Sequence, residues 1–177
     1  MTQRFFLWLM SWVLSALIVG CSTAPKPLPP SAPVRESKGV LSKERESRGV
    51  LSQDKRQDVV IQSMAMLDRN YTYGGKKLHT GFDCSGLVSF VYKQSAGVAL
   101  QGSAADMAKR TRPIDAQSAQ PGDLVFFNTL GTPNSHVGIY IGSGKFIHAA
   151  NERTGVRQER LDNSYWSKRF EGFRTLN

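Results

Sequence analysis

Apolar side chains recur at helical spacing in the first part of the region 58–177. Asp58 precedes the first set, which predicts a helix over about 58–69 with Asp58 as its N-cap: Val59, Val60, Ile61, Met64, Ala65 and Leu67. A second apolar stretch runs from Cys84 to Gly97, so we expect a second helix with Cys84 in its first turn. A short third helix is expected over about 103–110, capped by Ser103.

The pattern changes beyond Pro121-Gly122. Short segments rich in aromatic and β-branched residues alternate there with Gly, Asn and Pro, which is typical of strands: 123–127, 136–141, 145–149, 156–160 and 170–175. Helices followed by strands predict an α+β fold.

One predicted hairpin carries two of the three histidines. Gly142-Ser143-Gly144 is typical of a hairpin turn, so we expect His136 and His148 on neighbouring antiparallel strands, within a residue or two of register. A base and the residue that orients it would be held rigidly in such a position. The remaining histidine, His79, lies in a polar loop, and we interpret it as a solvated residue.

The N-terminus has the pattern of a secretory signal. Arg4 precedes an apolar run from Phe5 to Gly20, which is shorter than the ~20 residues of a membrane-spanning helix and similar to the core of a signal peptide. The run ends in Ile18-Val19-Gly20-Cys21, which resembles the lipobox of bacterial lipoproteins, where the cysteine is lipidated and becomes the mature N-terminus. A short transmembrane anchor, or cleavage elsewhere with Cys21 incidental, is the alternative.

A polar segment separates this leader from the apolar patterns. Residues 22–57 are rich in Pro, Ser, Lys, Arg and Glu, so they cannot bury enough surface to offset the entropy cost of ordering. They contain two similar decapeptides, 35–44 and 45–54, which are too few to stack as a solenoid. We therefore divide the chain into three parts: a lipoprotein signal peptide at 1–20, a lipid anchor and flexible linker at 21–57, and a domain at 58–177.

The formal charge of +9 is spread over the leader, the linker and the domain. A basic stripe with interleaved aromatic residues is absent, which argues against a nucleic-acid partner. An anionic wall polymer or a lipid headgroup fits the basic balance at least as well. The chain has no C-x-x-C motif and no close Cys/His pair, so we expect neither a metal nor another cofactor.

The use of cysteine points to a nucleophile. The chain has two cysteines, and if Cys21 is lipidated, Cys84 is a lone thiol in an oxidising compartment. Backbone N–H groups at a helix N-terminus favour the thiolate, but by roughly 0.3–1 kcal/mol, which is less than one pKa unit. A histidine ion pair can lower a thiol pKa by about five units, so we expect a cationic histidine to provide most of the activation.

Five ordered motifs resemble the NlpC family (NlpC/P60) of papain-like peptidoglycan endopeptidases: Tyr71-Thr-Tyr-Gly-Gly75, Gly81-Phe-Asp-Cys-Ser-Gly-Leu-Val88, Pro121-Gly-Asp-Leu-Val-Phe-Phe127, Ser135-His-Val-Gly-Ile-Tyr140 and Phe146-Ile-His-Ala149. The resemblance extends over about 58–177 and includes Tyr165-Trp166. It implies a papain-like fold with N-terminal helices packed on a small antiparallel sheet. It also implies Cys84 as nucleophile, His136 as base and His148 as the residue that orients the base.

The same resemblance suggests residues that bind substrate. Tyr71 matches a tyrosine near the nucleophile, which would contact substrate or the oxyanion, although simple packing beside Tyr73 is equally consistent. Asp83 and Ser85 match a pair that in some members contacts the free amine of a stem peptide, but Asp83 could instead only cap the helix. We interpret Asp123, in the Pro-Gly-Asp turn, as structural rather than catalytic.

These observations predict a cell-wall hydrolase, a cysteine endopeptidase that acts on peptidoglycan stem peptides or their cross-links. An amidase that cuts between sugar and peptide, and a wall-binding lipoprotein of the same fold without turnover, are the alternatives. We expect the protein in the cell envelope, held by its lipid and facing the periplasm. Because Ser22 rather than Asp follows Cys21, we favour the outer membrane. The sequence leaves the oligomeric state open.

Overall fold

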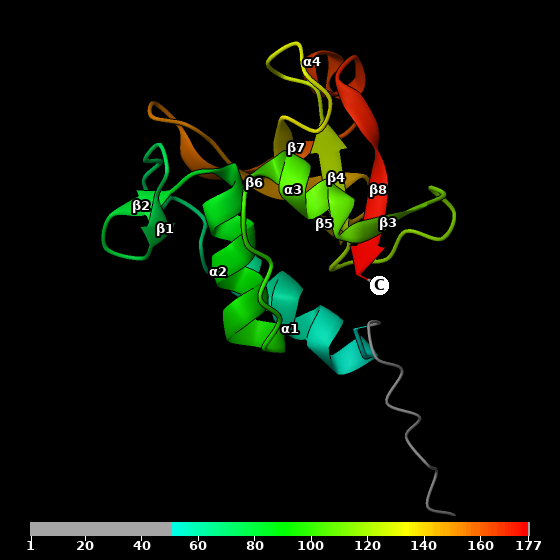
Figure 1. Ribbon diagram of the computed structural model, residues 1–177, viewed down its shortest axis with the longest axis horizontal. Helices are drawn as coiled ribbons and strands as arrows, with labels where there is room; N and C mark the ends of the chain where they lie inside the picture. Colours follow the sequence, from blue (N-terminus) through cyan, green and yellow to red (C-terminus); the bar gives the residue numbers. More distant parts are fainter. Residues whose placement is uncertain (1–50, 177) are drawn as a thin grey trace, which may run out of the picture. The chain divides into compact units, whose positions relative to one another are not determined.

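The computed structural model describes residues 51–176, which belong to one compact unit (Figure 1). The predicted signal peptide, Cys21 and the linker up to residue 50 lie outside the described residues. The helices in the described part are α1 (Gln53–Met64), α2 (Cys84–Ala96), α3 (Ala104–Lys109) and α4 (Ser164–Ser167). None of them is long and apolar enough to cross a membrane.

The strands form two antiparallel sheets. The larger sheet contains, in spatial order, β3 (Thr111–Ile114), β8 (Phe170–Leu176), β4 (Leu124–Phe127), β5 (His136–Gly142), β6 (Lys145–Asn151) and β7 (Gly155–Arg160). The smaller sheet pairs β1 (Lys76–Lys77) with β2 (Gly81–Phe82), directly before α2. In Figure 1 the small sheet lies beside the first turn of α2, away from β3 and β8.

Both faces of the larger sheet are covered. Successive residues of β4 belong to different clusters: Leu124 and Phe126 pack with the helical core, whereas Val125 and Phe127 pack with Trp166 of α4. Side chains of a strand alternate between its faces, so a strand that is covered on both faces is apolar throughout. This explains why the run Leu-Val-Phe-Phe is completely buried.

The structure confirms the α+β fold and most of the predicted elements. Helix α2 begins at Cys84 and ends before Gly97, whose φ of 71° is the left-handed conformation that suits a C-terminal glycine. Ser103 caps α3, and its hydroxyl and the Asp106 carboxylate form a capping box. Each predicted strand is present, and β5 and β6 form the expected hairpin, in which Ile139 pairs with Ile147.

The predicted bounds of the first helix were wrong. Helix α1 begins at Gln53 with Ser52 as its N-cap, so the predicted boundary after residue 57 lies within it. The reason is a contact that is distant in sequence: the guanidinium of Arg56 is buried and forms an ion pair with Asp123 at 2.7 Å. A polar first turn therefore packs against the domain, although its sequence has the composition of a linker.

The sequence analysis also missed four short elements. Strand β3 lies at the edge of the sheet and contains Pro113, which is tolerated there because an edge strand needs fewer backbone donors. The two-residue strands β1 and β2 and the single-turn helix α4 are too short to show a hydrophobic period.

Close backbone approach explains two glycines of the first motifs. The Asp83 amide donates to the Gly75 carbonyl at 3.0 Å, which holds the loop before β1 against the first turn of α2. A Cβ on Gly86 would overlap that same carbonyl oxygen. A Cβ on Gly75 would lie 2.5 Å from the Gly81 carbonyl oxygen. Only glycine fits at positions 75 and 86, and the contact fixes the start of the helix that carries Cys84.

Candidate active site

Cys84 occupies the first position of α2, where backbone donors surround its sulfur. Asp83 is the N-cap, and its carboxylate accepts from the Gly86 amide at 2.6 Å. The Val137 amide on β5 and the amides of Cys84 and Ser85 lie close enough to the sulfur to lower the pKa of the thiol. The proximity of Val137 places Cys84 against β5, one residue along that strand from His136, although the two are distant in sequence.

The two strand histidines are in direct contact. His136 Nε2 lies 2.7 Å from His148 Nδ1, and both rings are buried. This contact leaves Nδ1 of His136 as the nitrogen that can serve Cys84. For Nδ1 to accept a proton, the neutral His136 ring carries its hydrogen on Nε2 and donates it to His148 Nδ1.

The tautomer of His148 follows from that of His136. If His148 Nδ1 accepts, the hydrogen of His148 is on Nε2. Within residues 51–176, His148 Nε2 is the one buried side-chain polar atom without a hydrogen-bond partner. A buried donor without a partner lowers the stability of the fold. His148 has this cost at Nε2, while its Nδ1 holds His136 in the tautomer that can act as a base.

Trp166 packs against both histidines, and the sequence analysis assigned it no role. Its ring stacks on His136 with centroids 5.5 Å apart and meets the edge of His148 at 4.7 Å. Phe127 and Phe146 complete an apolar cluster around the pair. The signal that could have identified Trp166 is its place in the C-terminal Tyr-Trp pair, but helix α4, which presents it, is too short to predict.

Burial determines the charge of the resting site. It raises the pKa of the Cys84 thiol above its ordinary value, against the opposing effect of the Val137 amide. Burial also lowers the pKa of His136 to about 4, although the nearby Asp83 carboxylate acts in the opposite direction. The pKa of His148 is lowered by burial, and further by the positive charges of His136 and Arg157. The raised pKa of Cys84 and the lowered pKa of His136 both favour a neutral thiol beside a neutral imidazole. These directions are opposite to those that the expected thiolate–imidazolium ion pair requires.

The predicted substrate residues lie at the start of α2. Tyr71 pairs with Phe82 and is close enough to Cys84 and Asp83 for their charges, after burial, to raise the pKa of its phenol. The Ser85 hydroxyl donates to the Asp83 carboxylate at 3.0 Å. Asp83 therefore both caps the helix and faces the site, so the two readings of this residue are compatible.

Two further predicted assignments can be located. His79 is exposed in the turn between β1 and β2. Asp123 is buried, and besides the ion pair with Arg56 it accepts from the Gln120 amide at 2.8 Å, which agrees with a structural role. The described residues contain no group of three or more His, Cys, Asp or Glu that could hold a metal ion.

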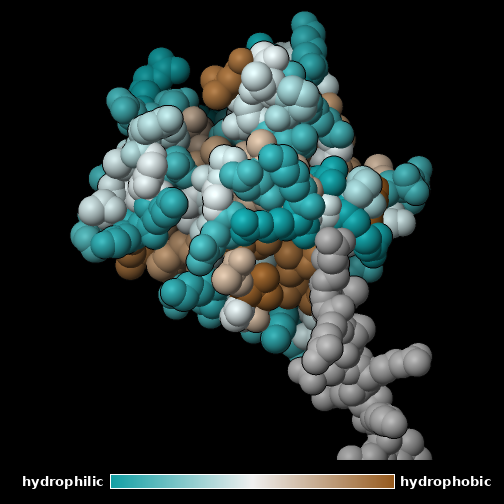
Figure 2. Space-filling model, in the orientation of Figure 1, coloured by the Kyte–Doolittle hydropathy of each residue, from teal (hydrophilic) through white to brown (hydrophobic). Residues whose placement is uncertain are grey.

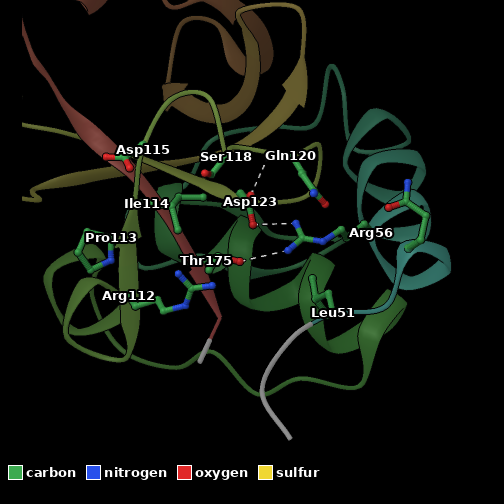
Figure 3. Close-up of a pocket in the computed structure, with 11 residues that line it drawn as sticks. Leu51, Arg56, Arg112, Pro113, Ile114, Asp115, Ser118, Gln120, Asp123 and Thr175 are labelled. Carbon is green, nitrogen blue, oxygen red and sulfur yellow. Dashed lines mark hydrogen bonds and ion pairs between the residues drawn. The ribbon is translucent and has the colours of Figure 1, made fainter. Parts of the chain in front are cut away.

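Two pockets lie at different places on the domain. A pocket of about 540 Å³ surrounds the Arg56–Asp123 ion pair and is lined by Leu51, Arg112 and Thr175 among others (Figure 3). It is lined by neither Cys84 nor a histidine. A second pocket, of about 470 Å³, opens beside His136, and we call it the His136 pocket; its walls include Leu130, Arg153, Arg157, Tyr165 and Trp166.

The walls of the His136 pocket come from three segments. They are the β4–β5 loop with His136 at the start of β5, the β6–β7 hairpin with both its turn and its strands, and helix α4 with its N-cap Asn163. In Figure 2 the outline of the molecule is notched between the teal tip of the β6–β7 turn and the lobe that contains the β4–β5 loop and α4. A pocket of this volume is large enough for a small ligand or a short part of a polymer.

The comparisons with known proteins agree with this arrangement. A model described as the NlpC/P60 family matches residues 68–175. The chain is 36% identical over 116 residues to the murein DD-endopeptidase MepH of Escherichia coli, covering 64% of this chain and 43% of that protein. It is 40% identical over 108 residues to a gamma-DL-glutamyl hydrolase of Bacillus subtilis, covering 60% of this chain and 26% of that protein. The chain thus spans less than half the length of these relatives.

Solved structures show the same fold. A Staphylococcus aureus protein described as similar to lipoprotein, NLP/P60 family, superposes with a TM-score of 0.63 at 32% identity, over 73% of this chain and 44% of that one. The NlpC/P60 domain of the peptidoglycan hydrolase SagA superposes with a TM-score of 0.57 at 28% identity, over 68% of this chain and 97% of that domain.

Proposed function

Because the chain belongs to the NlpC/P60 family, we propose that it is a cysteine endopeptidase that hydrolyses amide bonds in peptidoglycan stem peptides. The observation that supports this most strongly is the His136–His148 contact beside Cys84, since it provides a nucleophile, a base and a residue that orients the base. The names of the relatives, which include a murein endopeptidase and a gamma-DL-glutamyl hydrolase, agree with this class of substrate.

The chemistry proceeds in two stages. Cys84 Sγ attacks the carbonyl carbon of the scissile amide while its proton passes to His136 Nδ1, and the carbon–nitrogen bond then breaks as His136 returns that proton to the leaving amine. Water, with His136 as base, hydrolyses the thioester and restores the thiol. His148 keeps Nδ1 of His136 directed at the reacting atoms. Since burial favours the neutral pair, proton transfer accompanies attack instead of preceding it.

Among the amide bonds of peptidoglycan, we favour the cross-link between stems or another stem bond of the intact wall. The support is the lipid proposed at Cys21, since a tethered enzyme suits a fixed polymer. The alternative within the same chemistry is the bond between D-glutamate and the diamino acid of a soluble, sugar-free stem. A free amine on such a stem would suit the Asp83 carboxylate beside Cys84.

The test uses the full chain, since truncation at residue 58 would remove the first turn of α1 and Arg56. Purified sacculi and sugar-free stem peptides are incubated separately with the protein, and products are identified by mass. Conversion of cross-linked dimers to monomers supports the wall assignment, and cleavage confined to sugar-free stems overturns it. Release of intact stems from their sugar would identify an amidase. Cys84→Ala should abolish all products, and if it does not, the cysteine mechanism is wrong.

We also propose that Cys21 carries the lipid that holds the protein in the envelope, facing the periplasm and in the outer membrane. The support is the sequence alone, namely Ile18-Val19-Gly20-Cys21 at the end of an apolar run. Mass spectrometry of the mature protein should find an acylated N-terminal Cys21, and Cys21→Ala should release the protein or block its processing. An unmodified Cys21 inside the mature chain would contradict the proposal.

A further inference from the structure

The two ends of the site differ in charge. At one end, the Asp83 carboxylate lies close enough to Tyr71 to act on its phenol. At the other end, the side chains that line the His136 pocket include the cations Arg153 and Arg157 and one carboxylate, Glu159. Glu152 precedes Arg153 in the β6–β7 turn but does not line the pocket. A substrate that crosses Cys84 therefore meets the Asp83 carboxylate on one side and two guanidinium groups on the other, of which that of Arg157 is paired with Glu159.

The chemistry decides which part of the substrate meets the pocket. His136 must return its proton to the leaving amine, so that amine and the residue bearing it lie against His136. The acyl part, bonded to Cys84, then extends toward Tyr71 and Asp83, neither of which lines the pocket. The fragment released as an amine is therefore the one that occupies the His136 pocket.

Arg153 is placed to meet an anion. The Asn151 side-chain oxygen accepts from the Arg153 amide at 3.0 Å and from the Thr154 amide at 3.2 Å, which fixes the β6–β7 turn that presents Arg153. Within residues 51–176, the Arg153 guanidinium makes no hydrogen bond or ion pair with another residue. Arg157, by contrast, binds Glu159 through Nε at 2.8 Å, so part of its charge is already compensated.

We propose that the His136 pocket is the subsite for the amine-bearing fragment and that it selects a fragment with a free carboxylate, bound by Arg153 with support from Arg157. This proposal rests on the proposed function. In a stem peptide, the residue that supplies the leaving amine is a diamino acid, and a free carboxylate beside its amine is an anion that a guanidinium binds through two parallel hydrogen bonds. Amidation of that carboxylate would remove the charge while preserving the shape.

The experiment compares two substrates that differ only in this group. Stem peptides with the same scissile bond are prepared with the carboxylate free or as carboxamide, and kcat and KM of the full chain are measured on each. We expect kcat/KM to be about 10- to 100-fold higher for the free carboxylate. Arg153→Gln should reduce that preference about tenfold or more by lowering kcat/KM for the carboxylate substrate alone. Arg112→Gln, which changes an exposed arginine in the other pocket, is the matched control.

Binding of the released fragment separates this proposal from the proposed function. The free diamino-acid peptide and its amide are titrated into Cys84→Ala, with and without Arg153→Gln. If the carboxylate form binds more tightly than the amide, and this difference is lost in Arg153→Gln, the subsite is supported. Absence of cleavage of both substrates would overturn the proposed function but not the subsite. Equal kcat/KM for the two substrates, equal binding of the two fragments, or equal effects of Arg153→Gln and Arg112→Gln would each overturn the subsite.

Discussion

His136 Nε2 and His148 Nδ1 lie 2.7 Å apart, and this contact determines which nitrogen of His136 can act as a base. A histidine whose Nε2 is held by a neighbour presents Nδ1 to the thiol in one tautomer and one orientation. The contact depends on the β5–β6 hairpin, in which the turn at Gly142 to Gly144 sets the register of the two strands. It is therefore a property of the sheet, on which catalytic geometry is held more rigidly than on loops.

Replacement of His148 should reduce turnover without unfolding the domain. His148→Leu removes the acceptor for His136 Nε2–H, so the His136 ring can rotate, and we expect kcat to fall by about 10²–10⁴-fold. His148→Gln retains a side-chain acceptor and should keep more activity than His148→Leu. Turnover of peptidoglycan fragments and circular dichroism provide the two readouts. Wild-type kcat in His148→Leu would show that His148 does not orient the base.

The protonation state of Cys84 can be read from its alkylation rate as a function of pH. An ordinary cysteine thiol has a pKa of ~8.5. Because burial raises the pKa of the Cys84 thiol, the alkylation rate of the free enzyme should rise only at a pH above that value. His136→Ala should leave the slow rate below pH 7 almost unchanged. A fast reaction below pH 7 that is lost in His136→Ala would instead establish a thiolate–imidazolium pair and contradict the neutral resting site.

Trp166 should control the basicity of His136. The stacked indole keeps water from the histidine pair, so Trp166→Ala should let the pKa of His136 rise from about 4 toward its ordinary value. The acidic limb of the kcat/KM profile should move to higher pH, because His136 becomes protonated, and inactive as a base, at higher pH. Trp166→Phe preserves an aromatic contact and should move the limb less. An unchanged limb in Trp166→Ala would exclude this role.

The buried histidines should make the free energy of unfolding depend on pH. His136 has a pKa of about 4 when folded and about 6.5 when unfolded, so the unfolded chain binds more protons between these values. The free energy of unfolding is therefore highest above pH 6.5 and falls as the pH drops toward 4, by about 3 kcal/mol from His136 alone. His148 contributes in the same direction.

Urea denaturation between pH 7 and pH 4 measures this dependence. His136→Gln should flatten the slope, because the folded state then excludes one fewer proton. His79→Gln, which changes an exposed histidine in the β1–β2 turn, is the control. An equal slope in wild type and His136→Gln would show that His136 is not held neutral by burial.

The amino-acid sequence alone determined the order and type of most elements. Helical spacing after Cys84, strand-type segments after Pro121 and the turn at Gly142 to Gly144 are local signals, and each element appeared where its pattern predicted it. The candidate catalytic set was also accessible, since a lone cysteine at a helix start and two histidines on one hairpin are visible without coordinates. Local periodicity is sufficient for such features because both strands of a hairpin are close in sequence.

The tertiary structure alone decided the features that depend on residues far apart in the chain. The first turn of α1 is ordered because Arg56 meets Asp123, and Trp166 reaches the histidines only through a helix of a single turn. The direction in which burial shifts the pKa values of Cys84 and His136 was also inaccessible from the sequence, because the helix N-terminus and a nearby histidine are local features, whereas desolvation depends on the whole surrounding cluster. Burial outweighs the backbone donors at Cys84, and no pattern along the sequence shows how completely a side chain will be buried.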